Sequence, residues 1–156
     1  MGVSGSGKTT VGRLLAASLA WPFYDADDFH SPANVEKIRK GIALTDQDRA
    51  PWLESMRQAI ATWIASSANA VLACSALKDS YRDLLFVGPE VRFVYLKGSF
   101  ELLQARLKSR HDHFATEAIL PSQLATLQEP ADAVIVDITP APPVIVDEIL
   151  TRLGLQ

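Results

Sequence analysis

The chain has 156 residues, of which 48% are hydrophobic, and carries a net charge of −3. This length predicts one domain, spanning residues 1–156, with a single core. The acidic balance argues against general nucleic-acid binding, and no apolar run approaches the ~20 residues that a membrane-spanning helix needs. The one cysteine, Cys74, allows no internal disulfide and fits a reducing compartment. We therefore expect a cytoplasmic protein without a membrane or nucleic-acid partner.

Helix-like and strand-like apolar periodicities alternate along the chain. Residues 8–19 are predicted to form a helix with Val11, Leu14, Leu15 and Leu19 on one face. Short strands are predicted at 23–25, 70–73, 91–96 and 134–138. Further helices are predicted at 33–40, from Pro51, after Ser99 and after Pro143 up to Gly154, with an irregular stretch at 109–120. This alternation predicts an α/β protein with a parallel sheet covered on both faces.

The sequence GVSGSGKT at residues 2–9 fits the phosphate-loop pattern G-x-x-x-x-G-K-[ST] in full. Its glycines allow the backbone N–H groups to turn toward phosphate oxygens, and the following helix adds the positive end of its dipole. Lys8 is expected to contact the β- and γ-phosphates, and the Thr9 hydroxyl to ligate Mg²⁺. The predicted ATP-binding residues here are Gly2, Val3, Ser4, Gly5, Ser6, Gly7, Lys8, Thr9 and Thr10.

A phosphate loop is expected to follow a buried strand, but only Met1 precedes Gly2. That strand normally lies in the middle of the sheet, and without it two neighbouring strands would have unpaired edges. We expect the native chain to start upstream of Met1. The alternative is a working protein with a gapped sheet.

An acidic segment, DADDFH at residues 25–30, follows the second expected strand. In an open α/β sheet that edge faces the ligand crevice. Asp25 is predicted to hold Mg²⁺ through water, and Asp27 to orient a substrate hydroxyl and take its proton. Asp28 is expected to be structural, and His30 is a candidate substrate contact. The alternative interpretation is a solvated turn that caps the next helix.

Six segments together resemble the gluconokinase family of P-loop kinases. They run in order over nearly the whole chain: MGVSGSGKTT, DADDFHSPANVEKIRKGIALTDQDRAPWL, CSALKDSYRDLL, VYLKGS, RLKSRHDHF and SQLATLQEP. The phosphate loop alone is common to many enzymes, whereas the combination of these segments is specific. The resemblance implies phosphorylation of D-gluconate on its 6-hydroxyl with ATP and Mg²⁺, and it suggests a homodimer.

The same resemblance implies a P-loop NTPase-type three-layer fold with a five-stranded parallel sheet. The implied strand order is 2-3-1-4-5, with the first strand absent here, and a small helical lid is expected at about residues 109–127. The chain departs from the family pattern at Ala115, where a methionine is expected, and in a shortened segment after Pro130.

Gluconate carries a carboxylate, and the resemblance points to Arg49, Lys78 and Arg82 as its binding cations. Lys78 and Arg82 are four residues apart, so they share a helix face, and Arg82 can hold a carboxylate with two parallel hydrogen bonds. The alternative is an ordinary solvated face on which these cations pair with Asp79 and Asp83.

Arg106 and Arg110 are also four residues apart, at the end of the helix that follows the strand predicted at 91–96. A lid there could bring an arginine onto the transferring phosphoryl group, so both are predicted nucleotide-binding residues and Arg110 a catalytic one. The alternative is that these cations simply favour a helix C-terminus. No aspartate ends the strand predicted at 70–73, so the predicted Mg²⁺ ligands are Thr9 and Asp25.

Two other functions remain open from the sequence. One is a kinase for another small hydroxy acid such as shikimate, although the glycine-rich substrate motif of that enzyme is absent. The other is a nucleotide-binding module without turnover, suggested by the missing strand.

Overall fold

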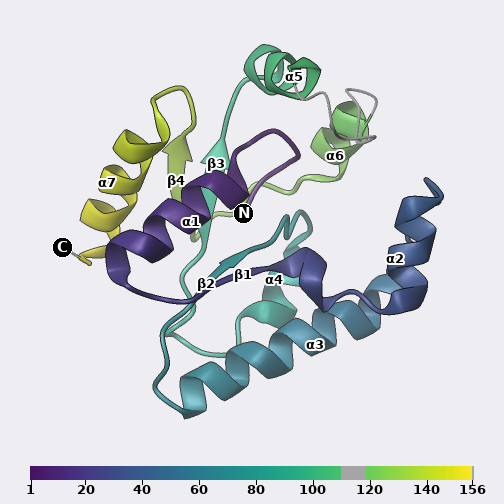
Figure 1. The fold of residues 1–156 in the computed structure, drawn as a ribbon, viewed down its shortest axis with the longest axis horizontal. Helices are drawn as coiled ribbons and strands as arrows, with labels where there is room; N and C mark the ends of the chain where they lie inside the picture. Colours follow the sequence, from purple (N-terminus) through teal and green to yellow (C-terminus); the bar gives the residue numbers. More distant parts are fainter. Residues whose placement is uncertain (110–118, 156) are drawn as a thin grey trace.

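The computed structural model describes residues 1–109 and 119–155, and its described strands form two parallel pairs (Figure 1). Strand β1 (Phe23–Asp25) pairs with β2 (Val71–Ala73), and β3 (Val94–Lys97) pairs with β4 (Val134–Asp137). The predicted neighbours are therefore confirmed, and the predicted gap lies between the two pairs. The strand predicted at 91–96 begins later than expected, at Val94.

Met1 is the link between the two pairs. Its amine donates to the Val94 carbonyl oxygen at 2.5 Å, and its own carbonyl accepts from the Leu96 N–H at 3.0 Å. This is the pattern of a parallel bridge opposite Tyr95. The next N–H, of Gly2, donates to the Ser75 carbonyl oxygen at 3.3 Å, just beyond β2. Burial lowers the pKa of the Met1 amine to about 5.

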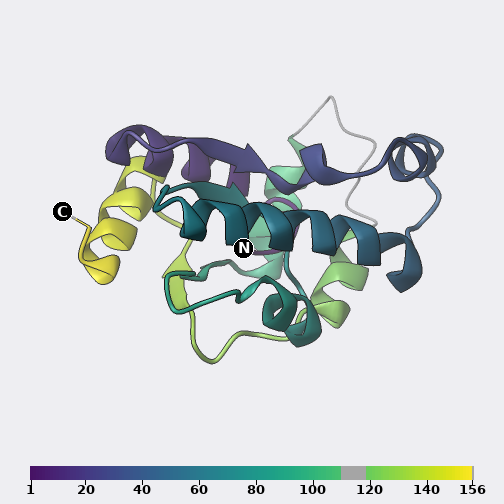
Figure 2. The ribbon, with the colours of Figure 1, turned by 90° about the horizontal axis from the view of Figure 1, so that it is seen from below.

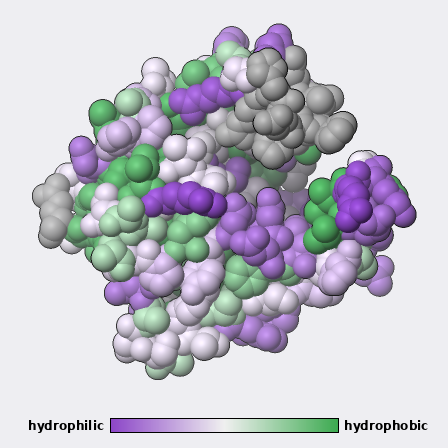
Figure 3. All heavy atoms as spheres, in the orientation of Figure 1, coloured by the Kyte–Doolittle hydropathy of each residue, from purple (hydrophilic) through white to green (hydrophobic). Residues whose placement is uncertain are grey.

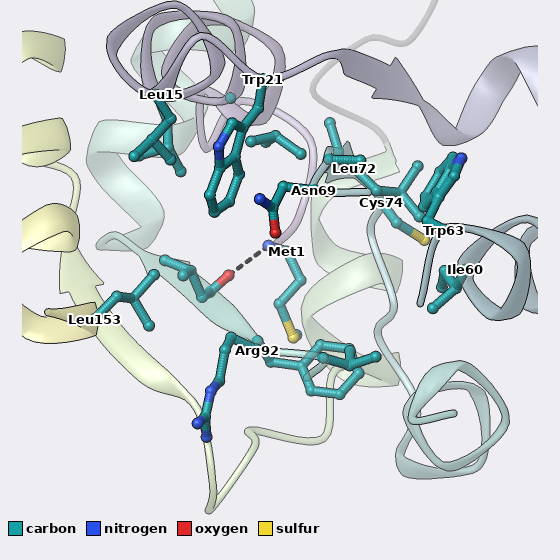
Figure 4. A pocket seen from close by; sticks show the side chains of 18 of the residues that line it. Met1, Leu15, Trp21, Ile60, Trp63, Asn69, Leu72, Cys74, Arg92 and Leu153 are labelled. Atoms are coloured by element: carbon teal, nitrogen blue, oxygen red, sulfur yellow. Dashed lines mark hydrogen bonds between the residues drawn. The ribbon is translucent and has the colours of Figure 1, made fainter. Parts of the chain in front are cut away.

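A cavity of about 720 Å³ lies between β2 and β3 and is lined by Met1, among others (Figure 4). Leu72 and Cys74 reach it from β2 and the residue after it, and Leu153 from the last helix. The unpaired strand edges expected from the sequence thus border a largely apolar space.

Helices cover both faces of the strands (Figures 1 and 2). Val71 and Val94 pack into one core cluster with α1 (Lys8–Leu19) and α7 (Pro142–Leu153). Their chain neighbours Leu72 and Phe93 pack into a second cluster with α3 (Asp46–Ala65) and α4 (Asp79–Leu85). Successive strand residues point to opposite faces, so the two clusters are the two sides of one layered α/β fold.

The remaining described elements are η1 (Ala26–Phe29), α2 (Pro32–Arg39), α5 (Phe100–Lys108) and α6 (Ile119–Thr126). Helix α6 begins at Ile119, within the stretch predicted to be irregular at 109–120. None of the helices in the described ranges is both long and apolar enough to cross a membrane.

Helix α3 begins at Asp46, so the prediction of a start at Pro51 was wrong. The Thr45 side chain accepts from the Asp48 N–H at 3.1 Å, and the Asp48 side chain accepts from the Thr45 N–H at 3.0 Å. This capping box satisfies donors at the helix start, which outweighs the preference of Pro51 for a first turn. Leu14 was also misplaced, since it is 39% exposed while Val11 and Leu15 are buried.

The guanidinium of Arg82 fastens the loop after β2 to the segment after α6. It donates to the carbonyl oxygens of Ala76 at 2.7 Å, Leu77 at 3.2 Å and Gln128 at 2.6 Å, and pairs with Asp79. Its side chain is only 7% exposed. Buried carbonyls and a buried charge are costly without partners, so this arginine holds two segments in place.

Replacing Arg82 should therefore destabilise the fold. For Arg82→Ala we expect a loss of about 2–4 kcal/mol in the free energy of unfolding, because three carbonyl oxygens each lose a hydrogen bond and, among the described residues, only that of Leu77 keeps another donor, the Gln128 N–H. Urea denaturation measures this loss. The control is Arg57→Ala, which removes a 47% exposed arginine paired with Glu54 and should change stability by no more than about 0.5 kcal/mol. Equal effects of the two substitutions would contradict the fastening role.

Candidate active site

The phosphate loop takes its shape from glycines with left-handed backbone angles. Gly5 has φ +84° and Gly7 has φ +89°, and Gly7 is the residue before α1. A Cβ on Gly5 would also stand 3.1 Å from the Leu103 carbonyl oxygen. Both the angle and the space thus require glycine at this position. The loop ends at the positive end of the α1 dipole, which favours bound anions.

The two predicted magnesium ligands are neighbours in space. The Thr9 hydroxyl donates to Asp25 Oδ2 at 3.3 Å. Hydroxyl and carboxylate oxygens are donors that Mg²⁺ accepts, usually together with waters and phosphate oxygens. No group of three or more His, Cys, Asp or Glu side chains suited to a metal occurs within residues 1–109 and 119–155. The pair fits an ion that a bound nucleotide also holds, rather than a dedicated protein cage.

Asp25 also shapes the acidic turn. Its Oδ1 accepts from the Asp27 N–H at 3.0 Å and so caps η1, which carries Asp27 away from β1. The two carboxylates therefore do not share one strand face. Burial, and secondly the nearby charge of Asp25, raise the pKa of the Asp27 carboxyl above its usual range. A raised pKa suits a group that accepts a proton during a reaction.

His30 lies flat against Trp52, with ring centroids 4.6 Å apart and planes 11° from parallel. The indole Nε1–H of Trp52 donates to the Ala26 carbonyl oxygen at 2.7 Å, which fixes the tryptophan under the acidic turn. Burial lowers the pKa of His30. Its Nδ1 is buried without a hydrogen-bond partner among the described residues, and its contact with a substrate stays a prediction.

These groups line one cavity of about 490 Å³. It collects side chains from the phosphate loop, the acidic turn, the start of α3 and α6, and the molecular surface is hollowed beside α2 (Figure 3). Among the predicted site residues, the cavity is lined by Ser4, Gly5, Gly7, Lys8, Thr9, Asp25, Asp27, His30 and Arg49. The carboxyl ends of β1 and β2 thus meet the phosphate loop, as expected for an open α/β sheet.

Lys78 and Arg82 do not line this cavity. The Lys78 ammonium donates to Asp46 Oδ1 at 3.1 Å, and the Tyr81 hydroxyl donates to the same oxygen at 2.6 Å. Arg82 is engaged in the buried contacts described above. The binding of gluconate by these two cations stays a prediction, and both have carboxylate partners of this chain.

Arg106 donates to the Ile138 carbonyl oxygen at 2.7 Å, at the end of β4, and its guanidinium lies near Gly7. It therefore stands beside the phosphate loop, where a nucleotide contact stays a prediction. Arg110 lies outside the described residues, as do residues 110–118 of the lid predicted at 109–127.

Sequence reasoning assigned no role to two residues of this site. Trp52 was placed in the core, which is correct, but it also supports His30. Gln123 was part of the family segment SQLATLQEP, and its Oε1 accepts from the Ser4 N–H at 2.6 Å. The only sequence signal for Gln123 was that segment, because 119 residues separate the two partners.

Comparison with known proteins places the chain among small kinases. Residues 4–153 match the family model described as shikimate kinase. A probable gluconokinase of Rattus norvegicus is 46% identical over 150 residues, which cover 84% of this chain and 81% of the rat protein. A gluconokinase of Gluconobacter oxydans is 48% identical over 134 residues, which cover 85% of this chain and 75% of that protein.

A crystal structure of a gluconokinase from Sinorhizobium meliloti has the same architecture. It is 41% identical in sequence, superposes with a TM-score of 0.87, and the match covers 99% of this chain and 89% of that one.

The environment of Asp27 predicts an order of effects on its pKa. Asp25→Asn should lower the pKa of Asp27, because it removes the stronger of two like charges, while burial should keep it above the usual value. Asp28→Asn is the matched control and should lower it less, since Asp28 contributes least. Carbon-13 NMR of the carboxyl groups gives both values. A larger effect from Asp28 would show that the turn is arranged differently.

Proposed function

The chain belongs to the shikimate kinase family of P-loop kinases and, within it, to the gluconokinases, and from this membership we propose that it phosphorylates D-gluconate with ATP. The observation that carries the proposal is the single cavity that brings the phosphate loop together with Asp27, His30 and Arg49. One end of this cavity suits phosphate oxygens, and the other offers a carboxylate, an imidazole and a guanidinium to a polyhydroxy acid.

In the proposed reaction the 6-hydroxyl oxygen of gluconate forms a bond to the γ-phosphorus of ATP. The bond between that phosphorus and the β–γ bridging oxygen breaks, and ADP leaves with the bonding electrons. The hydroxyl proton passes to the Asp27 carboxylate and then to solvent. The products are 6-phosphogluconate and ADP.

On the nucleotide side, Lys8 supplies a positive charge for the β- and γ-phosphates, and the loop N–H groups supply directed donors. The Lys8 ammonium donates to the Val3 carbonyl oxygen at 3.1 Å, so it already lies over its own loop. Thr9 and Asp25 would hold Mg²⁺, which neutralises phosphate charge. Arg106 and, from outside the described residues, Arg110 are proposed to add positive charge near the transferred group.

On the substrate side, Asp27 orients the attacking hydroxyl and accepts its proton. The unpartnered Nδ1 of His30 is proposed to bond a gluconate hydroxyl. Arg49 is the predicted cation that lines the cavity, and its pair with Asp46 is loose, at 3.6 Å. It is therefore the best placed of the predicted cations to receive the gluconate carboxylate.

A shikimate kinase is the second candidate, because residues 4–153 match the family model of that name. Both substrates are hydroxy acids, so a cation and a base would serve either. The sequence identities of 46% and 48% to two gluconokinases, over most of the chain, favour gluconate.

A substrate panel tests the function directly. Release of ADP should rise with gluconate and stay near background with shikimate or nucleoside monophosphates.

Lys8→Ala should keep the fold and lose roughly two or more orders of magnitude in kcat, since a charge contact to the transferring group is lost. Circular dichroism checks that the variant is folded. Turnover of shikimate above gluconate, or full activity of Lys8→Ala, would reject the proposal.

Asp27 and Asp25 should differ in their response to magnesium. Asp27→Asn should lower kcat by roughly two or more orders of magnitude at every Mg²⁺ concentration, because the proton acceptor is lost. Asp25→Asn should regain activity as Mg²⁺ rises, because its role is to hold the ion. Rate against Mg²⁺ for both variants measures this. Rescue of Asp27→Asn alone would mean that the two roles are exchanged.

A further inference from the structure

Helix α6 reaches the phosphate loop through one side chain. The Oε1 of Gln123 accepts from the Ser4 N–H at 2.6 Å, a short and therefore well-formed contact. The assignment of oxygen and nitrogen in this amide is fixed by chemistry, because a backbone N–H can only donate. Both Gln123 and Ser4 line the 490 Å³ cavity, together with Lys8 and Thr9.

The amide nitrogen of Gln123, Nε2, makes no comparable contact within the described residues. No hydrogen bond among the described residues involves Nε2 of Gln123, which carries two N–H donors. Because Ser4 holds the oxygen, the amide plane is fixed and Nε2 is kept close to the loop. A pair of donors held there, with no partner within residues 1–109 and 119–155, is suited to anionic oxygens that enter the cavity.

We propose that Gln123 is a further catalytic residue, whose Nε2 donates to an oxygen of the phosphoryl group during transfer while its Oε1 stays on Ser4. This inference rests on the proposed kinase function. The charge on the equatorial oxygens of the transferring group is best stabilised by donors that need no rearrangement. Gln123 meets that condition, since the loop that binds the nucleotide also orients the amide.

The decisive variant is Gln123→Glu, which keeps the size and the oxygen for Ser4 and replaces the donors with a charged acceptor. We expect kcat to fall by about 100-fold or more, as for loss of one such donor elsewhere. The unfolding temperature should stay within about 2 °C of wild type, because the contact with Ser4 is retained.

A matched control is available in Gln128→Glu. The Oε1 of Gln128 accepts from the Asp79 N–H at 2.8 Å, so this glutamine also ties the α6 region to another segment, but it does not line the cavity. The same chemical change there should leave kcat within about 3-fold of wild type. Gln123→Ala, which loses the tie and the donors together, should lower kcat as Gln123→Glu does.

A binding measurement separates this role from general repulsion of nucleotide. Magnesium ADP should bind Gln123→Glu within about 5-fold of wild type, whereas magnesium ADP with fluoroaluminate, a planar mimic of the transferring group, should bind about 100-fold more weakly.

Four outcomes would overturn the inference. They are near-normal kcat in Gln123→Glu, equal losses for ADP and its fluoroaluminate complex, equal losses in Gln128→Glu, and a raised gluconate KM with unchanged kcat. If the wild-type protein itself released no ADP with gluconate, the proposed function would fail first, and the fluoroaluminate comparison would still test Gln123.

Discussion

Two consecutive residues, Met1 and Gly2, connect the halves of this molecule. Their backbone groups bond to β3 on one side and to the end of β2 on the other, and the phosphate loop begins immediately afterwards. The loop therefore inherits its position from both strand pairs. Gly5 and Gly7 in the loop have left-handed backbone angles that only glycine adopts readily, and these angles shape the turn that leads into α1. Everything proposed for the site depends on this placement, since Thr9 meets Asp25, and Ser4 meets Gln123, only if the loop lies between the two halves.

The site separates its charges in a way that suits phosphoryl transfer. Cationic and N–H donors gather at the loop, whereas the carboxylates lie on the turn after β1. Asp25 is tied by Thr9 and by the Asp27 N–H, while the pKa of Asp27 is raised. Two neighbouring carboxylates thus have different environments, which is consistent with the proposed roles of Asp25 at the ion and Asp27 at the proton.

Arginine and lysine residues near the site have unlike surroundings. Arg49 lines the cavity, Lys78 is held by Asp46, and Arg82 is nearly enclosed by carbonyl oxygens. An arginine that satisfies buried carbonyls stabilises the fold and cannot leave without exposing them to an apolar environment. The loop after β2 is thus held by hydrogen bonds next to the cavity, which Cys74 and Ser75 line.

The sequence alone was enough for the phosphate loop, the helix after it, the parallel pairs of strands and the acidic turn, because local patterns encode these features. Lys8 to Leu19 follows a helical period, and glycines at fixed spacing specify the loop. The start of α3 was predicted wrongly, because a capping box at Thr45 competes with Pro51. Only the tertiary structure decided which cations face the cavity, that His30 rests on Trp52, and that Gln123 reaches Ser4. These contacts join residues far apart in the chain, and their geometry follows from how helices pack on the strands, which no local pattern records.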